Sequence, residues 1–328
     1  MKILLYPLGF LYVAINFLRR KLYKLKILRQ ISFPSRTVSI GNITMGGSGK
    51  TPFTLHLADY YSKLNKKVLI VLRGYKRKSK GTILVKNESI ISEVGEEAII
   101  YKLNSSCDVV VSENRLDAIK VVDSIPDIIL LDDGFQHLRV KRDVDLVLID
   151  ASNQNDLKPF PYGKEREPIK SLKYADFVMI TKGKYQSLNR KIQKVLENKD
   201  VFEGDFFWEK SLYPSKILSD NLKDKKVLLL LGIGNPDYFM KMAIESGFKI
   251  EEKIFFEDHH FPEKEDLEKV LKIFKEKGCD LILTSEKDYI KWKEFEGLKD
   301  KILYPVLKLK ISNEERFYNL LEEKMRNG

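Results

Sequence analysis

The stretch Val38–Phe53, VSIGNITMGGSGKTPF, limits the fold of this chain more than any other part of it. It consists of a short apolar run, a glycine-rich turn and a Lys-Thr pair that opens a helix, which is the order found in phosphate-binding loops. Glycines in the turn let successive backbone N–H groups face an anion, and the start of the helix adds its positive dipole end. A glycine-rich turn that binds no ligand is the alternative, and the complete order of parts argues against it.

The loop predicts a nucleotide site. Lys50 would reach the β- and γ-phosphates, and the hydroxyl of Thr51 would bind Mg²⁺. The strict pattern G-x-x-x-x-G-K-[ST] has a glycine where this chain has Thr44, so the match is GKT with internal glycines. We predict ATP and Mg²⁺ as cofactors, with these nucleotide-binding residues: Thr44, Gly46, Gly47, Ser48, Gly49, Lys50 and Thr51.

A second element of the same site is predicted where Asp127–Leu131, a buried strand, runs into Asp132 and Asp133. An acidic residue at the tip of a strand beside a phosphate loop meets Mg²⁺ directly or through water. The pairing of this acidic tip with GKT strengthens both assignments. Gly134 and the residues Phe-Gln-His that follow it then turn the chain away.

Apolar strands alternate with helical segments along the whole chain, which predicts an α/β fold. We expect a P-loop NTPase-like, mostly parallel sheet with helices on both faces, a second smaller α/β domain and an N-terminal membrane-associated helix. Thr82–Val85 and Ser89–Val94 look like a hairpin, and the polar stretch 182–225 looks like an irregular linker. The predicted parts are residues 1–30 (membrane-associated helix), 31–215 (phosphate-loop domain), 216–310 (second α/β domain) and 311–328 (C-terminal helix).

The charge of the chain is concentrated at its beginning. The formal net charge is +11, and nine Lys or Arg residues occur before Asp59, the first acid. The run Ile3–Leu18 is almost wholly apolar, and six basic residues follow it between Arg19 and Arg29. A helix of this length reaches roughly 24 Å, short of a hydrocarbon core of about 30 Å. Dense charge after the apolar run is also the reverse of a signal peptide.

We therefore expect an embedded or interfacial anchor whose basic residues lie on an anionic membrane surface. A helix packed on the protein's own core and a short true span remain as alternatives. Nucleic acid is not an expected partner, because the basic residues adjoin an apolar run and do not spread over a face with interleaved aromatic residues. The two cysteines match no metal or disulfide spacing, which fits a reducing compartment.

Three further patterns have competing explanations. The basic loop Arg73–Lys78 follows a predicted buried strand, where ligands collect in parallel sheets, although a solvated charge run is the alternative. Glu96 and Glu97 open a helix, where acids often only complement the dipole. Gly232-Ile233-Gly234 lacks the third glycine of a dinucleotide fingerprint, and the acids and histidines at 257–260 lack the spacing of a metal site.

Several motifs in order identify a family that this chain resembles: GNITMGGSGKTP, RGYKRK, VGEEA, SENR, LDDGFQH, REP, DHH and TSEKD. The chain resembles the tetraacyldisaccharide 4′-kinases over nearly its whole length. The resemblance implies an ATP-dependent lipid kinase that transfers the γ-phosphate to the 4′-hydroxyl of a tetraacylated glucosamine disaccharide 1-phosphate in lipid A biosynthesis. It also implies a catalytic cleft between two domains and a location at the cytoplasmic face of the inner membrane, anchored by the N-terminal apolar helix. It leaves the oligomeric state open.

The resemblance also implies residue roles. The catalytic residues would be Glu96, His259, Asp133 and Lys50, and the metal would be held by Thr51, Asp132 and Asp133. Substrate or cleft residues would be Arg73, Arg115, Gln136, His137, Arg166 and Glu167. The family has an aspartate as its proposed base, working with a histidine. This chain has Glu96 at that position, with one more methylene.

Two other classes of protein share parts of this pattern. A P-loop GTPase or ATPase that drives a partner protein at the membrane would need guanine-reading or water-positioning residues. The chain has no Asn-Lys-x-Asp, and SEKD at 285–288 is only a distant likeness. A non-catalytic nucleotide sensor would tolerate loss of Glu96, His259 and Asp133. Phosphate transfer that depends on a lipid acceptor distinguishes the kinase from both.

Overall fold

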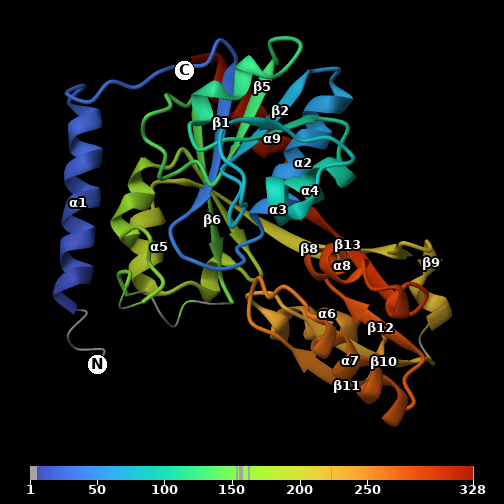
Figure 1. Cartoon of the computed structure of the whole chain (residues 1–328). Helices are drawn as coiled ribbons and strands as arrows, with labels where there is room; N and C mark the ends of the chain where they lie inside the picture. The colour runs from blue at the N-terminus through green and yellow to red at the C-terminus, as the bar shows by residue number, and fades with distance from the viewer. Residues whose placement is uncertain (1–5, 153, 155–157, 162, 223, 328) are drawn as a thin grey trace. The chain divides into compact units, whose positions relative to one another are not determined.

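The computed structural model describes residues 6–152, 154, 158–161, 163–222 and 224–327, so the start of the apolar run at Ile3 lies outside the described residues. The chain forms two compact units (Figure 1). The first contains Met1–Phe206 and Leu309–Gly328, and the second contains Phe207–Lys308. Each unit is built around its own set of parallel strands, as the alternating pattern predicts.

The first unit contains a mostly parallel sheet in the order β8-β7-β6-β1-β5-β2-β4-β3. Only the β3–β4 pair is antiparallel among the strand pairs of this path in the described chain. The strand bounds are β1 Arg36–Asn42, β2 Val68–Leu72, β3 Ile83–Leu84, β4 Asp108–Val111, β5 Ile128–Asp132, β6 Val144–Asp150, β7 Phe177–Thr181 and β8 Asp200–Tyr213. Strands β2 and β5 are buried at every residue, because helices cover both faces of the sheet.

The helices of this unit lie on opposite faces of the sheet (Figure 1). Their bounds are α1 Tyr6–Lys24, α2 Lys50–Lys63, α3 Ile91–Val94, α4 Glu96–Asn104, η2 Arg115–Lys120, η3 Ile169–Tyr174, η4 Tyr185–Ser187, α5 Arg190–Leu196 and α9 Glu314–Asn327. Side chains alternate along a strand, so neighbours point to opposite faces. Val178 of β7 joins the core under α5, whereas Phe177 meets Phe317 of α9 at 6.3 Å between ring centroids.

Two local predictions are wrong. Ile83–Leu84 pairs antiparallel with β4, and the predicted second arm of the hairpin contains the short helix α3. The stretch 182–225 is not an irregular linker, because it contains α5 and the long strand β8. Strand β8 alternates buried and exposed residues over much of its length, and this half-buried pattern hides it from a search for continuous apolar runs.

The second unit has parallel strands in the order β11-β10-β12-β13, and β9 pairs antiparallel with the end of β8. Its elements are β9 Ile217–Leu218, η5 Ser219–Leu222, β10 Lys226–Leu231, α6 Pro236–Glu245, β11 Lys249–Phe255, α7 Lys264–Glu276, β12 Leu281–Thr284, α8 Glu286–Trp292, η6 Glu296–Leu298 and β13 Ile302–Ile311. Strand β10 separates two hydrophobic clusters, one containing Leu229 and the other Leu230. This unit is therefore a smaller α/β layer structure.

Helix α1 packs on the first unit with one face only. Tyr12 meets Phe160 at 5.8 Å between ring centroids, and Arg20 is buried. The opposite face exposes an apolar stripe at Leu11, Ile15 and Leu18, each more than half exposed. Among the described residues, no helix has the length and apolarity needed to cross a membrane.

Candidate functional site

The phosphate loop follows the carboxyl end of β1, the strand between β5 and β6 where the strand order turns back. This is the position at which open α/β sheets bind ligands. Asn42 is buried and donates from Nδ2 to Ser48 Oγ at 3.1 Å, which closes the loop from inside. Gly49 has a φ of 85° and directly precedes α2. A Cβ at Gly49 would meet the ring of Phe206 at 2.1 Å, so only glycine fits there.

Strand β5 ends at Asp132, which is almost fully buried. Its Oδ2 accepts a hydrogen bond from Tyr101 Oη at 2.9 Å. Burial, and after it the nearby charge of Glu97, raises the pKa of Asp132 to about 6, while Lys50 acts in the opposite direction. Burial disfavours the ionised form of the Asp132 carboxyl group, so a cation bound beside it would stabilise that form.

Asp133, the next residue, has a different environment. Arg166 Nη1 contacts both of its carboxylate oxygens at 2.8 and 2.7 Å, and Lys50 Nζ lies 3.5 Å from Oδ1. Burial alone would raise the pKa of Asp133, but Lys50, Arg166 and Arg115 together hold it below its usual value. Asp133 has a φ of 50°, which turns the chain sharply after the strand. It therefore links the phosphate-loop lysine to the REP motif.

Helix α4 begins with the two glutamates. Glu96 is buried, and Glu97 acts on the charge of Asp132, so this helix end faces the tip of β5. Gly95 has a φ of 88°, and a Cβ there would lie 3.1 Å from the Tyr75 carbonyl. The glycine thus allows the basic loop after β2 to approach the start of α4. This close approach is a physical reason for the glycine in VGEEA.

The predicted substrate or cleft residues of this unit have defined contacts. Arg115 is buried and donates to the Asp132 carbonyl at 3.0 Å. Arg73 is exposed and its charge acts on Arg115. Gln136 Nε2 donates to the Asn42 carbonyl at 2.8 Å, so it supports the phosphate loop. Burial, and after it the nearby arginines, lowers the pKa of His137 to about 4, so its imidazole is neutral at neutral pH.

Arg166 and Glu167 are neighbours with separate partners. Arg166 pairs with Asp133, whereas Glu167 pairs with Arg20 of α1 through two hydrogen bonds of 2.7 and 2.5 Å. Arg20 also donates to the Phe135 carbonyl at 3.0 Å, and its guanidinium lies 4.3 Å from the centre of the Phe135 ring. In the sequence, Arg20 is recognisable only as one of the basic residues after the apolar run. Its role was missed because the partner is distant in sequence.

A second group of residues, which no sequence motif marks, supports the phosphate loop from the ends of β6 and β7. Thr181 Oγ1 donates to the Ser48 carbonyl at 3.0 Å. Lys182 Nζ donates to the Gly47 carbonyl and forms a buried pair with Asp150 at 2.8 Å. The only sequence signal is the position of Thr181 and Lys182 at the end of the apolar run Phe177–Thr181, which predicts a buried strand.

In the second unit, His259 lies in the loop after β11. Its backbone N–H donates to the Gly232 carbonyl at 3.3 Å, and its φ is 64°. His260 points elsewhere, because it stacks on Phe256 at 4.4 Å between ring centroids and pairs with Asp266 at 2.8 Å. The two adjacent histidines therefore have different surroundings, and the contacts of His260 with Phe256 and Asp266 make it a structural residue.

The residues present fit a nucleotide-bound Mg²⁺. Among the described residues, no group of three or more His, Cys, Asp or Glu is arranged to hold a metal ion. Magnesium in nucleotide sites needs only one or two protein oxygens, because phosphates and water supply the rest. Thr51 opens α2, and Asp132 is a buried carboxylate with a raised pKa, which a cation would relieve. Asp133 already contacts Arg166 with both oxygens.

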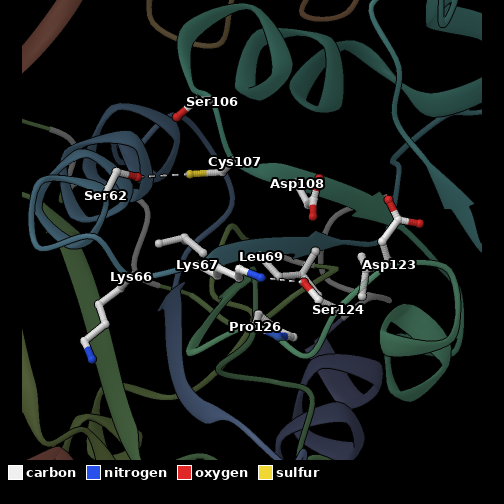
Figure 2. Close-up of a pocket in the computed structure, with 12 residues that line it drawn as sticks. Ser62, Lys66, Lys67, Leu69, Ser106, Cys107, Asp108, Asp123, Ser124 and Pro126 are labelled. Atoms are coloured by element: carbon white, nitrogen blue, oxygen red, sulfur yellow. Dashed lines mark hydrogen bonds between the residues drawn. The ribbon is translucent and has the colours of Figure 1, made fainter.

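A separate hollow of about 380 Å³ lies at the other edge of the sheet (Figure 2). Its lining comes from the end of α2, the amino ends of β2 and β4 and the segment before β5, and it includes Lys67, Cys107 and Ser124. Lys67 Nζ donates to Ser124 Oγ at 3.2 Å, and Ser62 Oγ lies 3.6 Å from Cys107 Sγ. The phosphate loop follows the carboxyl end of β1, so this hollow is not part of the candidate site.

Comparison with known proteins gives one consistent result. Residues 1–326 match the family model described as tetraacyldisaccharide-1-P 4′-kinase. A curated relative from Halothermothrix orenii, a tetraacyldisaccharide 4′-kinase, is 33% identical over 89% of this chain and 84% of its own length. A second relative with the same name, from Aquifex aeolicus, is 31% identical over 97% of each chain.

A solved structure is similar over nearly the whole chain. It is the LpxK of Aquifex aeolicus, crystallised in complex with ATP. It aligns with a TM-score of 0.80 at 29% identity and covers 99% of each chain.

Proposed function

Because the chain belongs to the tetraacyldisaccharide-1-P 4′-kinase family, we propose that it transfers the γ-phosphate of ATP to the 4′-hydroxyl of a tetraacylated glucosamine disaccharide 1-phosphate in lipid A biosynthesis. One structural observation carries the proposal furthest. Asp133, directly after β5, contacts Lys50 of the phosphate loop and Arg166 of the REP motif, so three separate sequence motifs meet around one carboxylate. The first unit thus supplies a cationic setting for a transferring phosphoryl group.

The donor side follows from the loop. Phosphoryl transfer needs positioning and positive charge around the γ-phosphate more than covalent chemistry. Lys50 would contact the β- and γ-phosphates, and backbone N–H groups from Gly46 to Gly49 would surround them. Thr51 and Asp132 would bind Mg²⁺, and Asp133 would assist through its contacts with Lys50 and Arg166. The bound ion would neutralise charge on the phosphate oxygens. Asp133 holds Lys50 and Arg166 in place through the contacts described above.

On the acceptor side, we assign the general base to Glu96, with His259 as its partner. A carboxylate with a histidine partner can accept the proton of the 4′-hydroxyl at neutral pH. Burial of Glu96 at the start of α4 and the proximity of this helix end to Asp132 support the assignment. Arg73 and Arg115 would meet anionic groups of the lipid headgroup, and His137 would line the cleft. Gln136 and Glu167 would act by support, through their contacts with the Asn42 carbonyl and with Arg20.

We further propose that α1 lies on an anionic membrane surface at the cytoplasmic face of the inner membrane. Its outward face has Leu11, Ile15 and Leu18 at helical spacing, and Lys21 and Lys24 are in its last turn. An apolar stripe with adjacent lysines is the pattern of an interfacial helix. Binding of this surface to the membrane would bring the site to a lipid substrate that lies in the same membrane.

The decisive experiment is a phosphotransfer assay with ATP, Mg²⁺ and an acylated glucosamine disaccharide 1-phosphate. The control is the same lipid without its free 4′-hydroxyl. Lys50→Ala should abolish transfer, whereas Lys63→Ala, at the exposed end of the same helix, should not. Rapid ATP or GTP turnover without lipid would instead support a nucleotide-driven switch.

The base and the membrane face have separate tests. Glu96→Gln should lower kcat far more than it weakens ATP binding, and Glu96→Asp should keep activity; an unchanged rate in Glu96→Gln assigns the base elsewhere. For α1, serine at Leu11, Ile15 and Leu18 should weaken binding to vesicles that contain anionic lipid. The matched control places serine at three residues of similar exposure away from α1: Ile90, Leu103 and Ile125.

A further inference from the structure

The TSEKD motif at 284–288 has no part in the site described above. Its aspartate, Asp288, lies in α8 and forms an ion pair with Lys291 at 3.0 Å, with both side chains almost fully buried. Two buried charges are costly unless further hydrogen bonds satisfy them. Asp288 Oδ2 accepts from Ser285 Oγ at 2.7 Å and from the Gly232 N–H at 2.9 Å. The motif therefore forms a buried network in which the Asp288 carboxylate has contacts with Lys291, Ser285 and Gly232.

This network reaches the tip of β10 at Gly232. A Cβ at Gly232 would lie 3.0 Å from Asp288 Oδ1 and 3.4 Å from the Glu257 carbonyl. The glycine backbone thus fits between the aspartate on one side and the loop after β11 on the other. This packing, and not a dinucleotide site, accounts for the glycine in Gly232-Ile233-Gly234.

Gly232 in turn holds His259. The Gly232 carbonyl accepts the His259 N–H at 3.3 Å. The φ of His259 is 64°, a region that residues other than glycine seldom occupy and that persists only where the surroundings fix it. On the far side of His259, His260 is tied to Phe256 and Asp266. The histidine is therefore in a backbone turn that is fixed from both sides.

We propose that Asp288 is a positioning residue for His259 and that Lys291, through its ion pair with Asp288, holds the Asp288 carboxylate in place. The contacts run from Asp288 to the Gly232 amide, and from the Gly232 carbonyl to the His259 amide. All of these residues belong to the second unit. The inference rests on the proposed role of His259 as partner of the base. It assigns to the TSEKD aspartate control over the geometry of the transfer step without contact with substrate.

The test compares two double variants that both remove the buried charges. Lys291→Met with Asp288→Asn keeps an oxygen that accepts the Gly232 N–H. Lys291→Met with Asp288→Leu keeps a side chain branched at Cγ and removes the acceptor. We expect the Asn variant to retain kcat within about threefold and the Leu variant to lose roughly 10- to 100-fold, because a misplacement of about 1 Å can cost a factor of 10². The KM for ATP should stay within about twofold in both.

The same pair in a His259→Ala background isolates the mechanism. If Asp288 acts through His259, the difference between the Asn and Leu variants should disappear there. An equal loss with and without His259 would overturn the proposal. If the Leu variant does not fold, Gly232→Ala replaces it, since its methyl group pushes between Asp288 and the Glu257 carbonyl and should reduce kcat in the same His259-dependent way.

The NMR signal of the His259 imidazole tests this inference independently of the proposed function, because it does not depend on activity. The His259 ring resonance of the full-length protein is assigned by its absence in His259→Ala. It should shift or broaden in the Leu variant and keep its position in the Asn variant. If His259→Ala retains full activity, the assigned role of His259 fails, and the resonance alone then decides the positioning claim. An unchanged resonance in the Leu variant refutes it.

Discussion

Gly41→Ala tests the packing that joins the GNIT and LDDGFQH motifs. A Cβ at Gly41 would lie 2.4 Å from Phe135 Cβ and 3.0 Å from Phe135 N. Carbon atoms pack best at about 3.5–4.0 Å, so the added methyl group requires a movement of more than about 1 Å. The atoms it meets belong to the backbone and Cβ, and no change of rotamer can remove them. Phe135 is fully buried.

The expected cost is large for one methyl group. Overpacking a buried site costs about 1–3 kcal/mol, and the backbone contacts place Gly41→Ala at the upper end. A loss of about 3 kcal/mol lowers the folding equilibrium constant by roughly 150-fold, since about 1.4 kcal/mol is a factor of ten. Strand β1 pairs with both β5 and β6, so the strain should also displace the loop and Asp132 and lower kcat.

Urea unfolding measures the cost, and Gly47→Ala is the matched control. A Cβ at Gly47 meets nothing within 4 Å, so the same substitution in the phosphate loop that follows β1 should change the free energy of unfolding by less than about 1 kcal/mol. Phe135→Gly removes the main opposing atom, and Gly41→Ala should cost less in that background. If Gly41→Ala and Gly47→Ala unfold at the same urea concentration, the steric reasoning is wrong.

Two further predictions concern charge at the site. The pKa of Asp132 is raised to about 6 by burial and then by neighbouring carboxylates, so its ionised form destabilises the fold as pH rises from about 4 to above 6. Asp132→Asn should therefore stabilise the metal-free protein at pH 8, by up to about 3 kcal/mol, with little gain below pH 4; urea unfolding in EDTA across this range checks it, and a pH-independent difference contradicts it. Lys182→Met should raise the KM for ATP about tenfold, with a smaller change in kcat, because the Gly47 carbonyl and Asp150 lose their donor. An unaltered KM would show that this support is dispensable.

The sequence predicts the local parts of this protein well. Continuous apolar runs mark buried parallel strands such as β2, and GKT marks the start of α2. Each of these signals consists of residues that lie close together in the sequence. The half-exposed strand β8 and the short helix α3 were misassigned because their apolar residues follow neither period over a sufficient length.

Partnerships across the chain are the part that the sequence does not reveal. The REP motif predicts that Arg166 and Glu167 are important, but not that one contacts Asp133 and the other contacts Arg20. Partner choice depends on which strand tips become neighbours, and that is set by the order of strands in the sheet. The support from Lys182 to the phosphate loop was missed for the same reason.

Two adjacent residues thus connect α1 to the phosphate site, and this connection leads to a last prediction. Arg20→Ala leaves Glu167, which is 2% exposed, without its cation, and breaking a buried pair costs about 3–5 kcal/mol. Arg20→Met with Glu167→Gln removes both charges and should recover much of the stability in urea unfolding. The double variant still lacks the bidentate bond between α1 and the motif that holds Asp133. We therefore expect it to raise the KM for the lipid in vesicles more than the KM for ATP, since α1 is proposed to lie at the membrane. Equal changes in both KM values would mean that Arg20 only stabilises the fold.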